Sequence, residues 1–502
     1  MVAVIVAGLA MQLGWHGVDW PAQLYRVHLF RTNGWVGYDT GWYGGNVPLA
    51  YSTLYPPLAA ALGVQLVAIG SVAVSAWAFD RLVRAGFGSA ARVGSVCFAA
   101  GLVVQVVIGQ LSFLLGLALG LTALLALRNR RTRVGAVLAI ACSLASFVAG
   151  LFLFLGTVAA WCTARPEDRR TAAILTAAAA APILLIAVAY HQAGRFPFPL
   201  STLGALLVAC AGLLVALPAS RRTLRLAVWL YAASAVALFI VPTPVGANVA
   251  RAATVAAAPL LLCVARRRAV VAVFVTFLVV WQLAPALRTV TADPAASTTR
   301  AFYVPLLAEL ARVAPAPSRL EIPLTLEHWE AAWVAPTIPL ARGWERQLDI
   351  VDNPLFYRDG PLTPSAYRAW LAKNGIGWVA LPRAPLDYSA RAEAHLLRAG
   401  PSYLQPTWSD RDWTLWRVVG THGMVTGPAR LTALDAASFT VVARRAGAAV
   451  VRIRYSPTWS IVDADGASCL GSTSDSWTRL RFRHAGPIRV EAQLLPRAAS
   501  AC

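Results

Sequence analysis

Acidic residues are nearly absent from the first half of this chain. Of its 502 residues only 13% are charged and 58% are hydrophobic, a balance outside that of soluble domains. Up to Leu287 the carboxylates are Asp19, Asp39, Asp80, Glu167 and Asp168. Long Ala, Leu and Val runs fill this part, and acids become frequent only after it. The composition excludes a single soluble domain and predicts a lipid-solvated part followed by a water-solvated one.

Several chemical motifs are also missing. No glycine-rich phosphate loop, HExxH motif or Gly-x-Ser-x-Gly elbow occurs in the strand–turn–helix context that each requires, so nothing supports nucleotide-driven chemistry. The seven cysteines show no metal-ligand spacing. Cys469 and Cys502 lie in the C-terminal part, where an oxidising exterior would let them pair. The others lie in apolar segments: Cys97, Cys142, Cys162, Cys210 and Cys263.

The basic residues do not indicate nucleic acid, although the net charge is +21. They form short clusters between apolar runs, whereas a nucleic-acid binder gathers them on one face of a soluble fold. Such clusters orient a multispanning protein through positively charged cytoplasmic loops. We expect about eleven spans, near residues 1–14, 57–79, 93–109, 110–127, 134–147, 148–164, 171–190, 200–217, 226–241, 253–265 and 269–287.

The arginines support this threading. Alternating the spans puts 16 of the 20 arginines before residue 288 on one side, which predicts a plasma-membrane protein whose C-terminal part is extracytoplasmic. Residues 134–164 are too long for one span and short for two. We expect a broken hairpin there, inside the bundle, because irregular backbone at membrane depth must be buried by protein.

The loop between the first two spans is the most polar and aromatic stretch of the membrane part. Asp19 can cap a helix that begins at Trp20, and apolar residues then recur at helical spacing, which predicts an amphipathic interfacial helix. On this interpretation Trp42 and Tyr43 belong to an interfacial aromatic belt. Alternatively, Asp19, backed by Asp39, accepts a proton from an attacking hydroxyl or holds a divalent cation, and the aromatic rings stack on sugars.

This arrangement resembles the GT-C superfamily of membrane glycosyltransferases, which use lipid-phosphate-linked sugars and place an essential Asp in the first exterior loop, here Asp19. It is also similar to a group of actinobacterial integral membrane proteins through the loop from Trp42 to Gly45 and its end from Tyr51 to Pro57. The resemblance implies a GT-C-like helical bundle, a polyprenyl-phosphate sugar donor and a catalytic role for Asp19, while Asp39 remains the second catalytic candidate from the loop itself.

Two further segments look similar to that group. Gly109 to Ser112 joins the third and fourth spans, and Pro242 to Arg251 leads into the tenth. The resemblance implies that an arginine near an exterior loop binds the lipid phosphate, for which Arg251 is the first candidate and Arg195 the second. The alternatives are a snorkelling interfacial arginine and a plain Pro/Gly turn.

The water-solvated part divides into two predicted domains. Residues 288–430 mix helical runs near 301–313, 364–373 and 389–399 with strands near 318–323 and 377–381, which indicates an α/β layer. Residues 431–502 alternate apolar and polar positions with a period of two, as at Val451 to Tyr455, which predicts a small β-sandwich or sheet. The membrane domain covers residues 1–287.

One segment of the α/β part concentrates the residue types that bind sugars. Trp, Arg and carboxylates cluster between residues 328 and 349, and the candidates for acceptor contacts are His328, Glu330, Arg342, Trp344 and Glu345. The alternative is a salt-bridged loop packed against the membrane bundle.

These patterns together favour an inverting glycosyltransferase that moves a sugar from a polyprenyl-phosphate donor to a cell-envelope glycan or glycolipid, with the bilayer as its solvent, no nucleic acid, and no cofactor beyond a possible divalent cation. A transporter or lipid flippase would need ionisable residues at midplane or repeated halves, and neither is clear. A non-catalytic envelope scaffold that binds glycan is the third hypothesis, and it predicts that Asp19 is dispensable.

Overall fold

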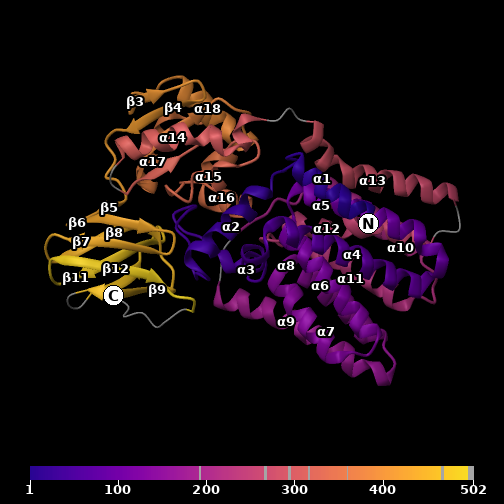
Figure 1. Ribbon diagram of the computed structural model, residues 1–502. Coiled ribbons are helices and arrows are strands. Elements are labelled where there is room, and N and C mark those ends of the chain that lie inside the picture. Colours follow the sequence, from indigo (N-terminus) through magenta and orange to yellow (C-terminus); the bar gives the residue numbers. More distant parts are fainter. Residues whose placement is uncertain are drawn as a thin grey trace. The chain divides into compact units, whose positions relative to one another are not determined.

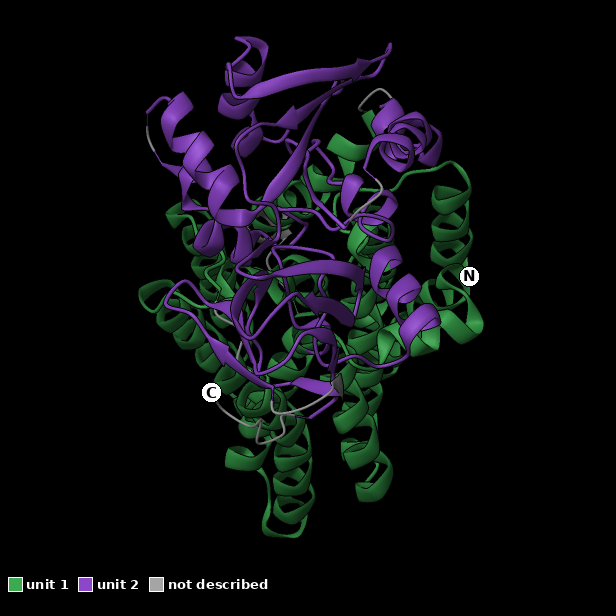
Figure 2. Ribbon diagram, turned by 90° about the vertical axis from the view of Figure 1, so that its left-hand side faces the viewer, with its two compact units in different colours: residues 1–23, 50–292 green, residues 24–49, 293–502 purple. Residues whose placement is uncertain are grey.

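The computed structural model describes residues 1–190, 194–264, 268–291, 295–314, 317–358, 360–464 and 468–495. The chain forms two compact units (Figures 1 and 2). Unit 1 comprises residues 1–23 and 50–292, and unit 2 comprises residues 24–49 and 293–502. The segment 24–49, which the sequence analysis assigned to the membrane domain, therefore groups with the C-terminal part.

Unit 1 is helical, and each of the apolar runs predicted as a span forms a helix. These helices are α1 (Val2–Gln12), α4 (Val64–Phe87), α5 (Arg92–Ile108), α6 (Leu111–Arg128), α7 (Thr132–Ala145), α8 (Phe147–Thr163), α9 (Pro166–Ala189), α10 (Leu200–Ala216), α11 (Arg222–Ile240), α12 (Arg251–Val264) and α13 (Arg268–Thr291). A short α3 (Tyr55–Leu62) and the 3₁₀ turns η1 (Pro48–Ala50), η2 (Gly88–Ala91) and η3 (Gly246–Ala250) connect them.

The lengths of these helices bear on the span count. Among the described residues, six helical stretches are long and apolar enough to cross a membrane, and one of them contains both α4 and α5. Four further apolar helices, α1, α7, α8 and α10, are shorter than that threshold. A membrane-type helical region is therefore shown, with fewer full-length candidates than the expected number of spans.

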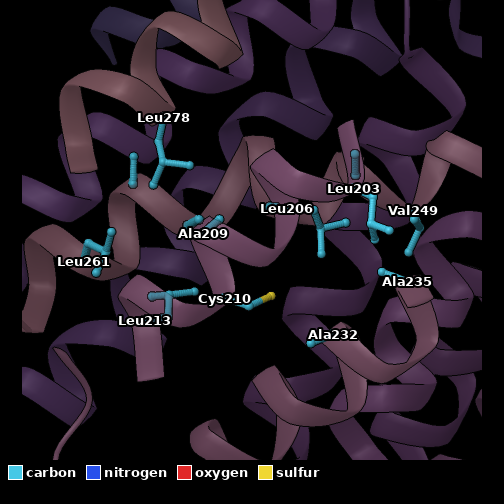
Figure 3. Close-up of a cluster of buried hydrophobic side chains, with 14 of the residues drawn as sticks. Leu203, Leu206, Ala209, Cys210, Leu213, Ala232, Ala235, Val249, Leu261 and Leu278 are labelled. Atoms are coloured by element: carbon cyan, nitrogen blue, oxygen red, sulfur yellow. The ribbon is translucent and has the colours of Figure 1, made fainter. Parts of the chain in front are cut away.

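Small side chains let the helices of unit 1 approach closely. Figure 3 shows a core in which Leu206 and Ala209 of α10 lie near Ala235 of α11 and Leu261 of α12. All of these side chains are buried. Alanine at such positions brings backbones together, which is how helices pack when lipid removes the hydrophobic driving force.

The expected break in residues 134–164 is present. Ser146 is extended between α7 and α8, and its side chain accepts a hydrogen bond from the Ala149 N–H. The break leaves carbonyls of α7 without helical partners. The N–H groups of Thr53 and Leu54 donate hydrogen bonds to the Leu144 carbonyl. The Ser52 hydroxyl donates to the Ala145 carbonyl at 2.7 Å. Protein groups thus satisfy the irregular backbone, as the sequence analysis required.

The helix α2 (Trp20–Asn33) begins at the predicted residue but is not an amphipathic surface helix. Gln23 and Arg26 are as buried as Tyr25 and Val27. Burial therefore does not follow an apolar stripe, and the interfacial interpretation is wrong for this helix. The sequence pattern failed because polar side chains of α2 have buried polar partners, described below.

The first part of unit 2 is an α/β layer. Its sheet has the order β1-β2-β4-β3, with β1 (Arg319–Glu321) parallel to β2 (Ile376–Pro382) and the other neighbours antiparallel. The remaining strands are β3 (Leu404–Ser409) and β4 (Trp413–Val418). The accompanying helices and turns are η4 (Ala296–Thr298), α14 (Arg300–Val313), α15 (Glu330–Trp333), α16 (Arg346–Asp352), η5 (Pro354–Tyr357), α17 (Pro364–Asn374), η6 (Tyr388–Ala390) and α18 (Arg391–Arg398).

The second part of unit 2 consists of two four-stranded antiparallel sheets. One has the order β10-β11-β8-β5 and the other β6-β7-β12-β9. In β8, Ala449, Val451 and Ile453 are buried and the residues between them are less so, which confirms the period-two prediction. The strands are β5 (Val425–Thr426), β6 (Ala429–Asp435), β7 (Ser438–Ala443), β8 (Gly447–Arg454), β9 (Trp459–Ala464), β10 (Cys469–Ser472), β11 (Trp477–Phe482) and β12 (Gly486–Ala492).

The cysteines of the apolar segments are all free thiols. Cys469 begins β10. Its expected partner, Cys502, lies outside the described residues, so that pairing stays a prediction.

Candidate functional site

The structure brings together two of the residues singled out in the sequence. In unit 1, Nη2 of Arg251 lies 3.6 Å from Oδ2 of Asp19, although 232 positions separate them in the chain. Asp19 is 7% exposed, and 16% of the Arg251 side chain is exposed. The pair is therefore largely shielded from solvent.

The end of α5 positions residues 17–20, which we call the Asp19 turn. The N–H groups of Gly17 and Asp19 donate to the carbonyls of Val107 and Ile108 at 2.8 and 3.0 Å, and the Trp20 indole N–H donates to Val106 at 2.8 Å. The turn is anchored to backbone on both sides of the carboxylate.

Gly109 makes this anchoring possible. It adopts a φ of +93° at the end of α5, a conformation that side chains disfavour. A Cβ added there would lie 2.4 Å from the Trp20 nitrogen and 2.9 Å from the Asp19 carbonyl carbon. Only glycine lets the Asp19–Trp20 backbone approach this closely, which gives the 109–112 segment a physical role.

Arg251 is the first residue of α12 and follows directly after the turn η3. The Tyr231 hydroxyl donates to the Val249 carbonyl at 2.6 Å and accepts from the Ala253 N–H, which fixes the start of α12. The guanidinium lies 5.7 Å from the centre of the Phe113 ring, at the beginning of α6. Phe113 was not singled out in the sequence, because one aromatic in an apolar helix carries no distinguishing signal.

The pair combines a carboxylate with a guanidinium, a group whose geometry matches phosphate oxygens. Arg251 places a guanidinium 3.6 Å from the Asp19 carboxylate, a group that can accept a proton in general base catalysis. Arg251 carries five N–H donors, and contact with one carboxylate leaves others for phosphate oxygens. The neighbouring positive charge does not suit a divalent cation. Among the described residues, no three metal-ligating side chains cluster together.

Arg195, the second candidate for phosphate binding, is an exposed residue ahead of α10. The adjoining residues 191–193, including His191, lie outside the described part of the chain.

Asp39, in contrast to Asp19, lies in the interior of unit 2. It is fully buried and accepts hydrogen bonds from the Tyr25 hydroxyl at 2.9 Å, the Asn46 amide at 2.9 Å and the Gly41 N–H at 3.1 Å. Burial raises the pKa of Asp39 to about 6, although these hydrogen bonds favour the ionised form. Asp39 holds the loop 39–46 in shape, and this geometry favours a structural role.

The two aromatic candidates of this loop are also interior residues. Trp42 is 1% exposed, stacks on Tyr25 with ring centres 4.4 Å apart, and donates to the Ala331 carbonyl. Tyr43 is 2% exposed and donates to the Glu345 carbonyl at 3.0 Å. Neither ring faces solvent, so neither offers a surface on which a sugar would stack.

Glu345 forms a buried ion pair with Arg26. The guanidinium lies 2.5 Å from the Glu345 carboxylate, and both side chains are 3% exposed. The guanidinium also lies 5.6 Å from the ring centres of Trp42 and Trp344. Burial raises the pKa of Glu345, and Arg26 opposes that rise.

Arg342 is the centre of a second buried network. It contacts Asp349 at 2.6 Å and Glu393 at 3.5 Å. Burial and the nearby Glu393 raise the pKa of Glu321 well above its usual range, and burial raises that of Glu393 to about 7. Burial thus opposes ionisation of both carboxyls, while Arg342 favours it.

Polar partners in the interior of unit 2 also fix the side chains of His328 and Glu330. His328, at φ +58°, lies 3.7 Å from Asp387, which Arg346 binds at 2.7 Å. Glu330 accepts from the Thr325 hydroxyl at 2.6 Å. The segment 328–349 is thus salt-bridged within unit 2, which agrees with the salt-bridged character of the alternative interpretation. Tyr25, Asp387 and Glu393 were missed because their partners are distant in sequence.

Compared with known proteins, the chain matches no family model and no curated protein sequence. The geometry of the Asp19–Arg251 pair therefore carries the functional interpretation.

Proposed function

We propose that the protein is a membrane glycosyltransferase of the GT-C type, which transfers a sugar from a polyprenyl-phosphate donor to a cell-envelope glycan or glycolipid on the extracytoplasmic face of the plasma membrane. The observation that carries this proposal is the shielded Asp19–Arg251 pair. It combines a proton acceptor with a phosphate-binding cation in a helical unit suited to a membrane.

In the proposed reaction an acceptor hydroxyl attacks the anomeric carbon of the donor sugar. The bond from that carbon to the lipid-phosphate oxygen breaks, and polyprenyl phosphate leaves with the bonding electrons. Asp19 takes the hydroxyl proton, and Arg251 stabilises the charge that develops on the phosphate. One direct displacement inverts the anomeric configuration.

The exterior placement is supported by the arginines. All eleven helices of the predicted threading exist in unit 1, and alternating crossings would put most of their flanking arginines on the cytoplasmic side. The Asp19 turn follows α1 and the unit 2 chain follows α13, so both would lie on the opposite side. In this proposal the shorter helices α1, α7, α8 and α10 also cross.

Unit 2 is the proposed acceptor-binding part. The buried contacts of Arg26, Glu345 and Arg342 give it a stable interior, and they leave acceptor recognition to exposed residues of unit 2. The helix α2 begins directly after Asp19 and continues into this unit. In this proposal Arg342 and Glu345, which the sequence suggested as acceptor contacts, stabilise the interior of unit 2 instead.

The test is transfer of radiolabelled sugar from polyprenyl-phosphate donors to envelope glycan acceptors by the purified full-length protein. Asp19→Asn should lower the transfer rate by about 10² to 10⁴, because a positioned general base contributes that much. Arg251→Gln should weaken donor binding, and Arg251→Lys should restore part of it.

The matched control is Asp168→Asn. Asp168 also pairs with an arginine, Arg130, at 2.7 Å, but these side chains are 37% and 62% exposed, far more than those of Asp19 and Arg251. This variant should transfer sugar at the wild-type rate. Equal rates for wild type and Asp19→Asn would remove Asp19 from the mechanism. Absence of transfer by the folded wild type from every polyprenyl-phosphate donor would contradict the proposal and favour the transporter and scaffold hypotheses.

A further inference from the structure

Unit 1 contains a cavity of about 810 Å³ that the proposed reaction does not use. It lies among α1, α4, α5 and α13, and we call it the α5 groove. Its walls are mainly apolar, and they include Val96, Val103 and Val107 of α5 and Leu283 and Leu287 of α13. The volume falls in the range of pockets that bind small ligands.

The α5 groove has two chemically different ends. Its lining follows α5 from Arg92 to Val107, about 22 Å at 1.5 Å per residue. Arg84, at the end of α4, and Arg92, at the start of α5, both line the same end because the turn η2 joins the two helices. Trp15 and Val107 line the other end, and Trp15 packs with Val104 there.

The charged end favours an anion. Arg84 and Arg92 are exposed, and the carboxylate in this part of the lining, Asp80, binds Arg84 at 2.7 Å. The three side chains together carry a net positive charge. Trp77 is 51% exposed one turn before Asp80, as expected for an aromatic residue at a membrane interface.

We propose that the α5 groove binds an anionic phospholipid, with an acyl chain along the apolar walls and the phosphate at Arg84 and Arg92. The apolar walls match a hydrocarbon chain, and guanidinium groups at one end match a phosphate. On the threading above, this end is cytoplasmic, so the lipid belongs to the inner leaflet. The site is separate from Asp19 and Arg251, and its test does not depend on sugar transfer.

The experiment uses the purified full-length protein, reconstituted into vesicles of phosphatidylcholine and phosphatidylglycerol with the same acyl chains. After extraction in mild detergent, native mass spectrometry counts the lipids that remain bound. The wild type should retain phosphatidylglycerol several-fold more than phosphatidylcholine. Arg84→Gln combined with Arg92→Gln should abolish the preference, and Asp80→Asn should increase it, because Arg84 then loses its competing carboxylate.

Two controls separate this site from general contact with lipid. Arg81→Gln with Arg133→Gln changes the net charge by the same amount at exposed positions outside the α5 groove and should leave the preference unchanged. Ala99→Phe fills the groove and should reduce retention of both lipids, whereas Ala177→Phe on the exposed side of α9 should not.

Equal retention of both lipids by the wild type would overturn the proposal. An equal loss of the phosphatidylglycerol preference in the Arg84/Arg92 and Arg81/Arg133 double variants would also overturn the proposal. Lipid retention would then depend on the overall charge of the protein. A thermal unfolding temperature close to that of the wild type, measured for each variant, shows that a loss of lipid does not reflect a loss of fold.

Discussion

Asp19 and Asp39 show how differently two carboxylates of one loop can be used. Asp19 faces a guanidinium and keeps slight exposure, and the proposed reaction uses it as the proton acceptor. Asp39 is fully buried and bonded to Tyr25, Asn46 and Gly41. The sequence could name both residues as candidates, but spacing alone could not separate them, because it says nothing about which side chains surround each one.

The environment of Asp39 predicts a pH dependence of stability. Its pKa is about 6 in the folded protein and 3.8 in its ordinary state. The folded state therefore binds more protons at this site between pH 4 and 6, and stability falls as the pH rises through that window. The contribution is about 3 kcal/mol at most. Asp39→Asn should remove this part of the slope, measured as the thermal unfolding temperature between pH 4 and 8.

The exposed Asp475 supplies the control, since it pairs with Lys373 while more than half of each side chain is exposed. Asp475→Asn should keep the wild-type slope. If Asp39→Asn also kept it, the Asp39 carboxyl would titrate as an ordinary surface group, and the structural role assigned to it would have to be abandoned.

At the scale of elements, the turn at the end of α5 places Asp19. Gly109→Ala would combine backbone strain at φ +93° with a Cβ 2.4 Å from the Trp20 nitrogen. Gly63 has nearly the same φ, +92°, but open space around its Cβ position. Gly63→Ala should therefore cost only about 1 to 2 kcal/mol of strain, whereas Gly109→Ala should cost more and displace the Asp19 turn.

Thermal unfolding of the two variants measures the difference, and the transfer assay adds a second readout. Gly109→Ala should lose sugar transfer while Gly63→Ala keeps it. Equal behaviour of the two alanine variants would mean that the close approach of Gly109 to Trp20 has no part in positioning Asp19.

The helices of unit 1 were predictable because each is a continuous apolar run between charges, and the break at Ser146 because the run there had the wrong length. The burial of α2 was not predictable from the sequence. Its polar residues, such as Gln23 and Arg26, predict an exposed face unless their partners are known, and the partner of Arg26 is Glu345, 319 positions away. Local patterns carry no information about such pairs.

At the scale of the whole molecule, a segment near the N-terminus folds as part of the C-terminal unit. Residues 24–49 belong to unit 2, where the Gly44 carbonyl accepts from the Arg454 N–H at 2.8 Å and the Thr40 N–H donates to the Ala436 carbonyl at 2.8 Å. A boundary drawn from composition could not find this, because the composition changes near residue 288 and the N-terminal segment is joined to unit 2 by tertiary hydrogen bonds.

The Arg26–Glu345 ion pair should stabilise this arrangement in a way that a double-mutant cycle can measure. Both side chains are 3% exposed, so Arg26→Gln leaves a buried carboxylate without its cation and should cost about 3 to 5 kcal/mol. Glu345→Gln should cost a similar amount. The double variant should be little worse than either single one, which gives a coupling energy of about 2 kcal/mol or more in denaturant unfolding followed by tryptophan fluorescence.

The comparison pair within the same unit is Lys373 and Asp475, whose side chains are 57% and 56% exposed. Solvent screens such a pair, so its cycle should give about 0 to 1 kcal/mol. Additive losses for Arg26 and Glu345 would show that each side chain acts through other contacts, such as the Trp42 and Trp344 rings beside Arg26. A large coupling would show that this ion pair links the N-terminal segment to the C-terminal part of unit 2, because its two residues are 319 positions apart in the chain.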